Sequence, residues 1–355
     1  MKKKLFSMIL ALTMVGALVG CSKTEEVETK DTATVETEEA ASAEGKTFKV
    51  GIIQYVDDAS LNQIVANLES QLDVLAEENG CTFEYEDYYC NGQADSTTIN
   101  QMVAELINDE VDVLVPIATP TAMICQAATE DNQIPVVFAA VSDPEGAGLV
   151  ASNDAPGANV TGTSDALNTE AVFDLMVAQN RDLQKVGLLY DKSQDSSAAP
   201  IEAAKAYMDA AGIDYVEKTG TSNDEVMLAA DALVAEEVEA IFTPTDNTIM
   251  TAELAIYEKF IDAGIPHYCG ADSFALNGAY LGYGVNYATL GEETANMVAE
   301  ILVKGADPAT LAVKTLDNGT ATVNTETAAS LDLDYEKIRD MCDGFVEVQT
   351  AEEFE

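Results

Sequence analysis

The sequence predicts an α/β protein made of two similar lobes, each built around a parallel β-sheet. From about Phe48 onward, short apolar runs alternate with longer segments of helical periodicity, the pattern of repeated βαβ units. The pattern then restarts about 130 residues further on: the strand at 238–245 resembles the one at 111–118, and Ile265-Pro266 repeats Ile134-Pro135. Any α/β chain shows weak echoes of this kind, but the matched junctions favour a duplication, and therefore two lobes.

The first group of elements comes from residues 49–141. The run at 49–55 is apolar enough for a strand buried on both faces. The segment 59–79 has helical spacing, with Leu61 and Ile64 on its apolar face, and Gly80 occupies the usual position just after a helix end. The other elements expected here are strands at 82–89, 111–118 and 134–141 and helices at 96–109 and 121–130.

The second group repeats this order. It comprises strands at 185–190, 214–218, 238–245 and 265–268 and helices at 198–211, 224–235 and 248–263. Strands joined by helices of this length form right-handed crossovers, which make each sheet parallel.

The amino-acid composition and net charge restrict which binding partners the protein can have. The chain has 355 residues, 47% of them apolar, which suffices for a core in each of two domains. It carries 63 acidic residues against 17 basic ones, a formal net charge of −46. Binding to nucleic acid or to anionic lipid through a basic surface is therefore excluded. The charge is typical of a protein that is soluble outside the cell.

The N-terminus is interpreted as a targeting segment. Residues 2–4 are lysines, residues 5–19 are mostly apolar, and Leu18-Val19-Gly20-Cys21 resembles a bacterial lipobox. We therefore expect a lipoprotein signal peptide at 1–20, acylation of Cys21, and an acidic, disordered tether at 21–47. The protein would then be anchored by lipid to the outer face of the bacterial cell membrane. The alternative is an ordinary secretory signal with an incidental cysteine.

The other five cysteines are an odd, scattered set, which is a poor disulfide framework. Cys81 and Cys90 bracket one predicted strand, whose ends would lie roughly 30 Å apart, beyond disulfide reach. The chain has no CxxC motif, and His267 is its only histidine. We expect no metal site and no cofactor.

Candidate binding residues follow from the fold. Ligands of parallel α/β sheets bind beyond the carboxyl ends of the strands, where this chain has many hydroxyl residues just before helices. Helix starts with hydroxyl groups suit a carboxylate, aspartates in the same loops suit an ammonium group, and tyrosines could wall a side chain. Neither arginine of the chain lies in these loops. The candidate ligand-binding residues are Gln54, Tyr55, Asp57, Ser60, Thr119, Pro120, Thr121, Ser142, Asp143, Thr163, Asp165, Tyr190, Ser193, Ser196, Ser197, Thr245, Asp246, Asn247, Asp272 and Tyr283.

Each candidate also has a purely structural interpretation. Asp246 is a natural N-cap for the helix after it, Thr119-Pro120 is a typical helix start, and Ser142-Asp143-Pro144 is a typical turn. Catalytic motifs are missing: the sequence has no Gly-x-Ser-x-Gly, P-loop or Gly-x-Gly-x-x-Gly pattern. We therefore expect a binding protein rather than an enzyme.

Five motifs together resemble a known family. They are Val111 to Pro120, Ile134 to Val150, Asn159 to Asp165, Pro244 to Asn247 and Gly282 to Tyr287. They are similar to the ABC-transporter substrate-binding family that includes tryptophan- and tyrosine-type binding lipoproteins. The resemblance runs from about Phe48 to the C-terminus. It implies the type I periplasmic-binding-protein fold, in which two Rossmann-like lobes are joined by a multi-strand hinge.

The resemblance also implies a domain division and a role. The first lobe would comprise residues 48–162 plus about 286–314, and the second 163–285 plus about 315–355. Hinge strands would lie near Thr161 to Asp165, Gly284 to Tyr287 and about Val313 to Leu316. A monomer would take up an amino-acid-like solute, aromatic ones included, and deliver it to an ABC permease in the membrane.

Several alternatives stay open at this point. Where relatives commonly carry a Glu-His-Pro-Ala-Leu-Asp-like stretch, this chain has Asp57-Asp58-Ala59-Ser60-Leu61-Asn62, so the ligand is not fixed by the resemblance. The same fold could bind a sugar or nucleoside. A lipoprotein sensor or a secreted hydrolase would be a different class of protein.

Overall fold

The computed structural model describes residues 43–316 and 318–354. The described chain forms an α/β structure with two seven-stranded sheets, as the sequence predicts. The expected signal peptide, the acylated Cys21 and most of the expected tether lie outside the described residues. No helix among the described residues is both long and apolar enough to cross a membrane.

The first sheet is entirely parallel, with the order β12-β6-β5-β4-β1-β2 and β3 beside the end of β1. Helices cover both faces, which is why the apolar side chains of β1 are fully buried, Val50, Ile52 and Ile53 among them. The strands are β1 (Thr47–Gln54), β2 (Thr82–Glu84), β3 (Tyr89–Asn91), β4 (Val113–Ile117), β5 (Val136–Phe138), β6 (Val160–Ser164) and β12 (Lys314–Thr315).

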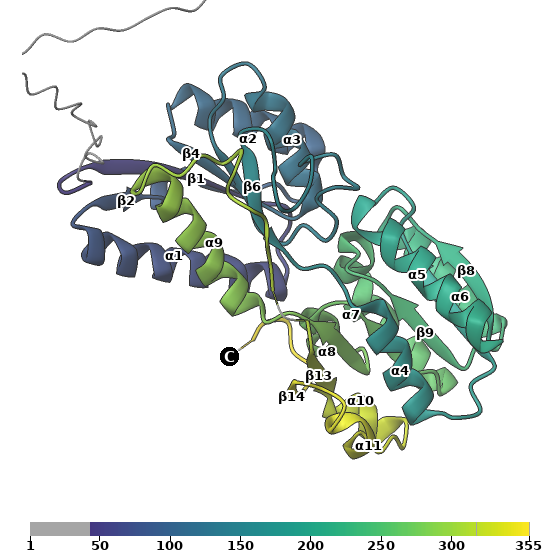
Figure 1. Cartoon of the computed structure of the whole chain (residues 1–355). Helices are drawn as coiled ribbons and strands as arrows, with labels where there is room; N and C mark the ends of the chain where they lie inside the picture. The colour runs from purple at the N-terminus through teal and green to yellow at the C-terminus, as the bar shows by residue number, and fades with distance from the viewer. Residues whose placement is uncertain (1–42, 317, 355) are drawn as a thin grey trace, which may run out of the picture. The chain divides into compact units, whose positions relative to one another are not determined.

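Two helix pairs pack on this sheet: α1 (Ala59–Asn79) with α9 (Tyr287–Leu302), and α2 (Ser96–Asn108) with α3 (Thr119–Thr129). Figure 1 shows α1 and α9 side by side. Their close approach needs Gly291, because a Cβ there would lie 2.4 Å from the carbonyl oxygen of Ile64. This sheet and these four helices are called the first lobe below.

The predicted strand at 82–89 is wrong in one respect. The structure divides it into β2 and β3, with a 3₁₀ turn at Glu86–Tyr88 between them. β2 pairs with the start of β1, and β3 pairs with the end of β1. The 3₁₀ turn between them therefore does not pair with the middle of β1. Cys81 and Cys90 flank this detour, and both are free thiols.

The second sheet has the order β14-β13-β11-β10-β9-β7-β8. All its pairs are parallel except β11 with β13. The strands are β7 (Lys185–Tyr190), β8 (Asp214–Thr219), β9 (Ala240–Thr243), β10 (His267–Cys269), β11 (Leu281–Gly284), β13 (Thr320–Asn324) and β14 (Gly344–Val348). Its helices are α4 (Thr169–Gln179), α5 (Asp195–Ala211), α6 (Asn223–Ala235), α7 (Asn247–Ala263), α8 (Asp272–Leu276), α10 (Thr325–Ser330) and α11 (Glu336–Arg339).

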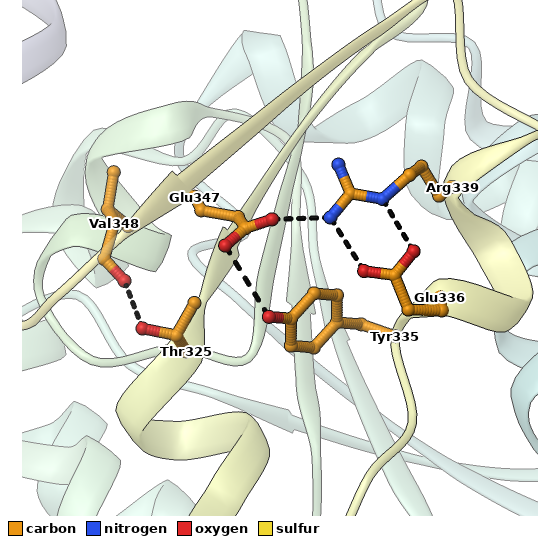
Figure 2. Close-up of polar contacts among 6 residues, drawn as sticks. All are labelled: Thr325, Tyr335, Glu336, Arg339, Glu347 and Val348. Atoms are coloured by element: carbon orange, nitrogen blue, oxygen red, sulfur yellow. Dashed lines mark hydrogen bonds and ion pairs between the residues drawn. The ribbon is translucent and has the colours of Figure 1, made fainter.

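This sheet and its helices are called the second lobe. Helix α4 packs with α5, and α6 with α7. Its C-terminal part is held by Arg339, which donates to both carboxylate oxygens of Glu336 at 2.8 Å and pairs with Glu347 on β14 (Figure 2). The guanidinium carbon of Arg339 also lies 4.1 Å from the ring centre of Phe345.

The chain passes between the two lobes three times. It leaves the first sheet after Ser164, returns between Gly284 and Tyr287, and leaves again between β12 and β13. Of the expected hinge strand Gly284 to Tyr287, only Gly284 lies in a strand, where it ends β11, and Tyr287 already begins α9. Thr163 and Ser164 pair with β12 in the first sheet, two residues beyond the boundary expected from the sequence. The domain division itself stays a prediction.

Candidate functional site

A cavity lies among loops and helix starts of both lobes. A water molecule can enter only about 10 Å³ of it, so the lining residues lie nearly in contact and a solute would have to enter before the lobes close on it. Both lobes contribute lining residues. The first lobe and the segment just after β6 contribute Ser60, Leu61, Ala118, Thr119, Ala140, Ser142, Asp165 and Tyr287. The second lobe contributes Ser196, Thr245, Asn247 and Met250. Most of these residues follow the carboxyl end of a parallel strand, the usual place for a ligand in such a sheet.

The backbone is strained on the first-lobe side of this cavity. Ala118 has φ 77° and Ala140 has φ 53°, values that residues other than glycine rarely adopt. Each such residue costs on the order of 1–3 kcal/mol. Such strain persists only where the surrounding structure enforces it, and it concentrates at functional sites.

Two helices begin at the cavity without a side-chain cap. Ala118 before α3 and Gln194 before α5 accept no hydrogen bond from the first turn through their side chains. In contrast, Asp58 caps α1 and Asp246 caps α7. The starts of α3 and α5 therefore keep N–H groups without a side-chain acceptor, and the helix dipole makes these positions favourable for an anion.

Three buried hydroxyl groups at the cavity have no hydrogen-bond partner. They belong to Thr119 at the start of α3, Ser196 in the first turn of α5, and Thr245 after β9. Their residues are 3%, 3% and 8% exposed. An unmet buried hydrogen bond costs about 1–3 kcal/mol, so an acceptor placed between these groups would be held strongly. A carboxylate has acceptor sites enough for all three.

Asp165 supplies the negative charge of the cavity. Its carboxylate accepts hydrogen bonds from the Ser142 hydroxyl (2.9 Å) and the Tyr287 hydroxyl (3.2 Å). Burial raises the pKa of Asp165, while these two hydrogen bonds lower it. No lysine, arginine or histidine lines the cavity, so a cationic group of a ligand would meet Asp165 without a competing protein cation.

Sequence comparison identifies the family. The profile described as "ABC transporter substrate binding protein" matches residues 49–339. This chain belongs to the ABC transporter substrate-binding protein family. It is thus an extracytoplasmic solute-binding protein and works with an ABC transporter.

Individual relatives agree with the family. The chain is 28% identical over 332 residues to the tyrosine-binding protein of Clostridioides difficile, covering 93% of both proteins. It is 28% identical to a structure from Streptococcus pneumoniae in complex with L-Trp, with a TM-score of 0.77 over 84% of this chain and all of that one. A ligand-free, open substrate-binding protein from Clostridium difficile is 27% identical, with a TM-score of 0.65 over 86% of this chain and all of that one.

The structure brings seven of the predicted site residues of this substrate-binding protein to the cavity. They are Ser60, Thr119, Ser142, Asp165, Ser196, Thr245 and Asn247. The other thirteen do not line it: Gln54, Tyr55, Asp57, Pro120, Thr121, Asp143, Thr163, Tyr190, Ser193, Ser197, Asp246, Asp272 and Tyr283. Ligand contact by the first group stays a prediction.

Many residues of the second group are engaged elsewhere in the protein. Asp246 accepts from the N–H groups of Asp191, Thr248 and Ile249 and from the Ser197 hydroxyl. Gln54 donates to Asn62 and the carbonyl of Val56. The other occupied side chains are those of Asp57 (from Asn62), Asp143 (from the Gly146 N–H), Thr163 (with Thr294), Tyr190 (to Glu217), Ser193 (to Asp191), Asp272 (from Ser60) and Tyr283 (to the Asn318 carbonyl).

Sequence reasoning did not select Leu61 and Met250, which form apolar walls of the cavity. Both sit on amphipathic helices, where a core position and a cavity wall give the same pattern. Sequence reasoning also did not select Ala118, Ala140 and Tyr287, the other three residues that line the cavity.

Proposed function

We propose that this substrate-binding protein captures an amino-acid-like solute, aromatic amino acids included, in the cavity between its lobes. The observation that carries the proposal is the set of three unpartnered, buried hydroxyls of Thr119, Ser196 and Thr245 around one space. They come from both lobes, so a carboxylate held among them would bond to the two lobes at once.

The proposed orientation follows from charge. The solute carboxylate lies at the uncapped starts of α3 and α5, and its ammonium group lies at Asp165. Leu61, Met250 and the ring of Tyr287 enclose its side chain. The tyrosine-binding relative and the L-Trp complex support an amino acid as the solute.

Isothermal titration calorimetry against the natural amino acids, neutral sugars and nucleosides tests the proposal. We expect binding of one or a few L-amino acids, and loss of at least about tenfold in affinity when the carboxylate is replaced by an amide, since charge-assisted hydrogen bonds contribute about 1.5–3 kcal/mol. Binding of a sugar or nucleoside alone would contradict the amino-acid assignment.

Single-residue variants, each with a matched control, test where the carboxylate and the ammonium group of the solute bind. Ser196→Ala and Asp165→Asn should each weaken binding by about tenfold or more. Ser330→Ala and Asp95→Asn remove an exposed serine and an exposed helix cap and should leave affinity unchanged. Equal effects in variants and controls would mean that the cavity is not the binding site.

We further propose that Cys21 carries a lipid anchor, that the protein is a monomer without catalytic activity, and that it delivers its solute to a permease. Mass spectrometry of the N-terminal peptide from cells tests the anchor, and an unmodified Cys21 would refute it. Uptake of the labelled solute in cells that lack the protein separates transport from sensing, because a sensor's loss would leave uptake intact.

A further inference from the structure

The two lobes touch through a cluster of acidic and hydroxyl groups beside the cavity. Ser60, on α1 of the first lobe, donates its hydroxyl to Asp272 on α8 of the second lobe at 2.5 Å. The Ser60 oxygen accepts from the backbone N–H of Ser273 at 3.1 Å. Gln63, also on α1, donates to the other oxygen of Asp272 at 3.0 Å. Asp272 is thus held by two residues of the opposite lobe.

A second carboxyl group lies in the same contact. Asp58 caps α1 and accepts the N–H groups of Ser60 and Leu61 at 2.9 and 3.4 Å. It is 8% exposed. Burial, and after it the nearby Asp272, raises the pKa of Asp58 to about 7, although hydrogen bonds oppose the rise. Burial also raises the pKa of Asp272.

Among the described residues, the other titratable groups near this contact are acidic. Tyr287 on α9 lies close enough for Asp165, Asp272 and Asp58 to raise its pKa further after burial. At the edge, Asn62 donates to Asp57 and to Glu353 of the C-terminal segment. In the described chain, no lysine, arginine or histidine forms an ion pair with any of these carboxylates.

We propose that Asp58 and Asp272 form a proton-linked latch, so that drawing the two lobes together takes up about one proton and solute affinity rises as the pH falls from 8 to 6. Contact between the lobes brings two buried carboxyls to one serine, because Asp58 accepts the backbone N–H of Ser60 and Asp272 accepts its hydroxyl, and among the described residues neither carboxyl has a cation beside it. A proton on Asp58 removes the repulsion and keeps its capping oxygen available.

The sign of the effect follows from linkage. When the lobes separate, Asp272 moves away from Asp58 and its repulsion is lost, so the pKa of Asp58 falls toward its ordinary value of about 3.9. The closed form therefore binds the proton more tightly, and low pH favours closure. With a pKa of about 7 in the closed form, affinity should rise about tenfold between pH 8 and pH 6, and stay nearly constant above pH 8.

Calorimetry of the full-length chain with L-tyrosine and L-tryptophan measures this coupling. Titrations at pH 6 and pH 8 in two buffers of different ionisation enthalpy give the number of protons taken up on binding. We expect uptake of close to one proton at pH 6 and close to none at pH 8. Binding at pH 6 without proton uptake would overturn the latch while leaving the proposed function intact.

Asp58→Asn is the decisive variant. Asparagine is as good an N-cap as aspartate and has the shape of the protonated acid. The variant should bind at pH 8 about as tightly as the wild type at pH 6, with no proton uptake at either pH. Asp95→Asn changes the exposed cap of α2 in the same lobe and should keep the wild-type pH profile.

Scattering without solute tests the latch independently of the solute's identity. The radius of gyration of the wild-type chain should be smaller at pH 6 than at pH 8, and Asp58→Asn should be compact at both. If no amino acid binds but this response is present, the proposed function fails and the latch stands. An unchanged radius in both proteins, together with pH-independent binding, would contradict the latch.

Discussion

The buried pair of Glu253 and His267 allows a worked prediction for the second lobe. Nε2 of His267 lies 2.8 Å from the Thr243 hydroxyl oxygen, and Nδ1 lies 3.0 Å from Glu253 Oε1. Because the Thr243 hydroxyl donates its hydrogen to the Leu189 carbonyl at 2.9 Å, Nε2 must donate to Thr243. Nδ1 and Glu253 then share a single proton, and the pair is neutral whichever atom carries it.

Substitution of His267 and substitution of Glu253 should lower the free energy of unfolding by different amounts. His267→Ala leaves the fully buried Glu253 without a side-chain partner among the described residues, since its Oε2 already has none there. The loss of one partner of a buried pair costs about 3–5 kcal/mol. Glu253→Gln keeps a donor for Nδ1 and keeps the pair neutral, so it should cost less than about 1.5 kcal/mol.

Urea denaturation at pH 7, followed by circular dichroism, measures both variants. The stability of this buried pair bears on the cavity, because Glu253 lies on α7, the helix that also carries Met250 and begins at Asn247. A cost for Glu253→Gln equal to that of His267→Ala would refute the neutral-pair reasoning, since it would mean that a charged carboxylate is essential there.

Three further perturbations follow from the packing. Gly291→Ala places a Cβ 2.4 Å from the Ile64 carbonyl oxygen and should lower stability in urea by about 1–3 kcal/mol; an unchanged midpoint would show that α1 and α9 can move apart. Burial raises the pKa of Asp246 to about 6 in the folded state, so folded protein binds its proton more tightly than unfolded protein. Its contribution to stability should fall by about 2 kcal/mol as the pH rises from about 4 to 6, and Asp246→Ala should remove that slope in urea titrations. Arg339→Ala removes two exposed ion pairs and the contact with Phe345 and should lower the urea midpoint only slightly, and a large drop would show that these contacts hold the second lobe together.

The alternation of strands and helices could be predicted because it rests on local signals. A parallel strand covered on both faces gives an apolar run, as in β1, and a glycine with positive φ ends α1, α5 and α7. The break between β2 and β3 could not be predicted from the sequence. It arises because residues 82–91 pair with the start of β1 and again with its end. The local sequence does not indicate which parts of β1 this segment will pair with.

The loops that surround the cavity could be predicted from the sequence, but which of their side chains line it could not. The carboxyl ends of the strands identified the loops, and Thr245, Asp246 and Asn247 were all selected from one of them. In the folded chain Asp246 turns inward and accepts four hydrogen bonds, whereas its two neighbours line the cavity. Which of three adjacent polar side chains is left without a partner depends on packing between distant segments.

Several departures from the usual local rules, each of which also occurs singly elsewhere in the described chain, meet at the cavity. Elsewhere helices such as α2 and α6 begin with a side-chain cap, yet α3 and α5 begin without one at the cavity. Ala118 adopts a backbone conformation that suits glycine, and buried hydroxyls there lack partners. Each departure costs stability, and none compensates another within the protein. A solute that accepts hydrogen bonds from both lobes would satisfy several of these groups at once, which gives one physical reason for the lobes to close on it.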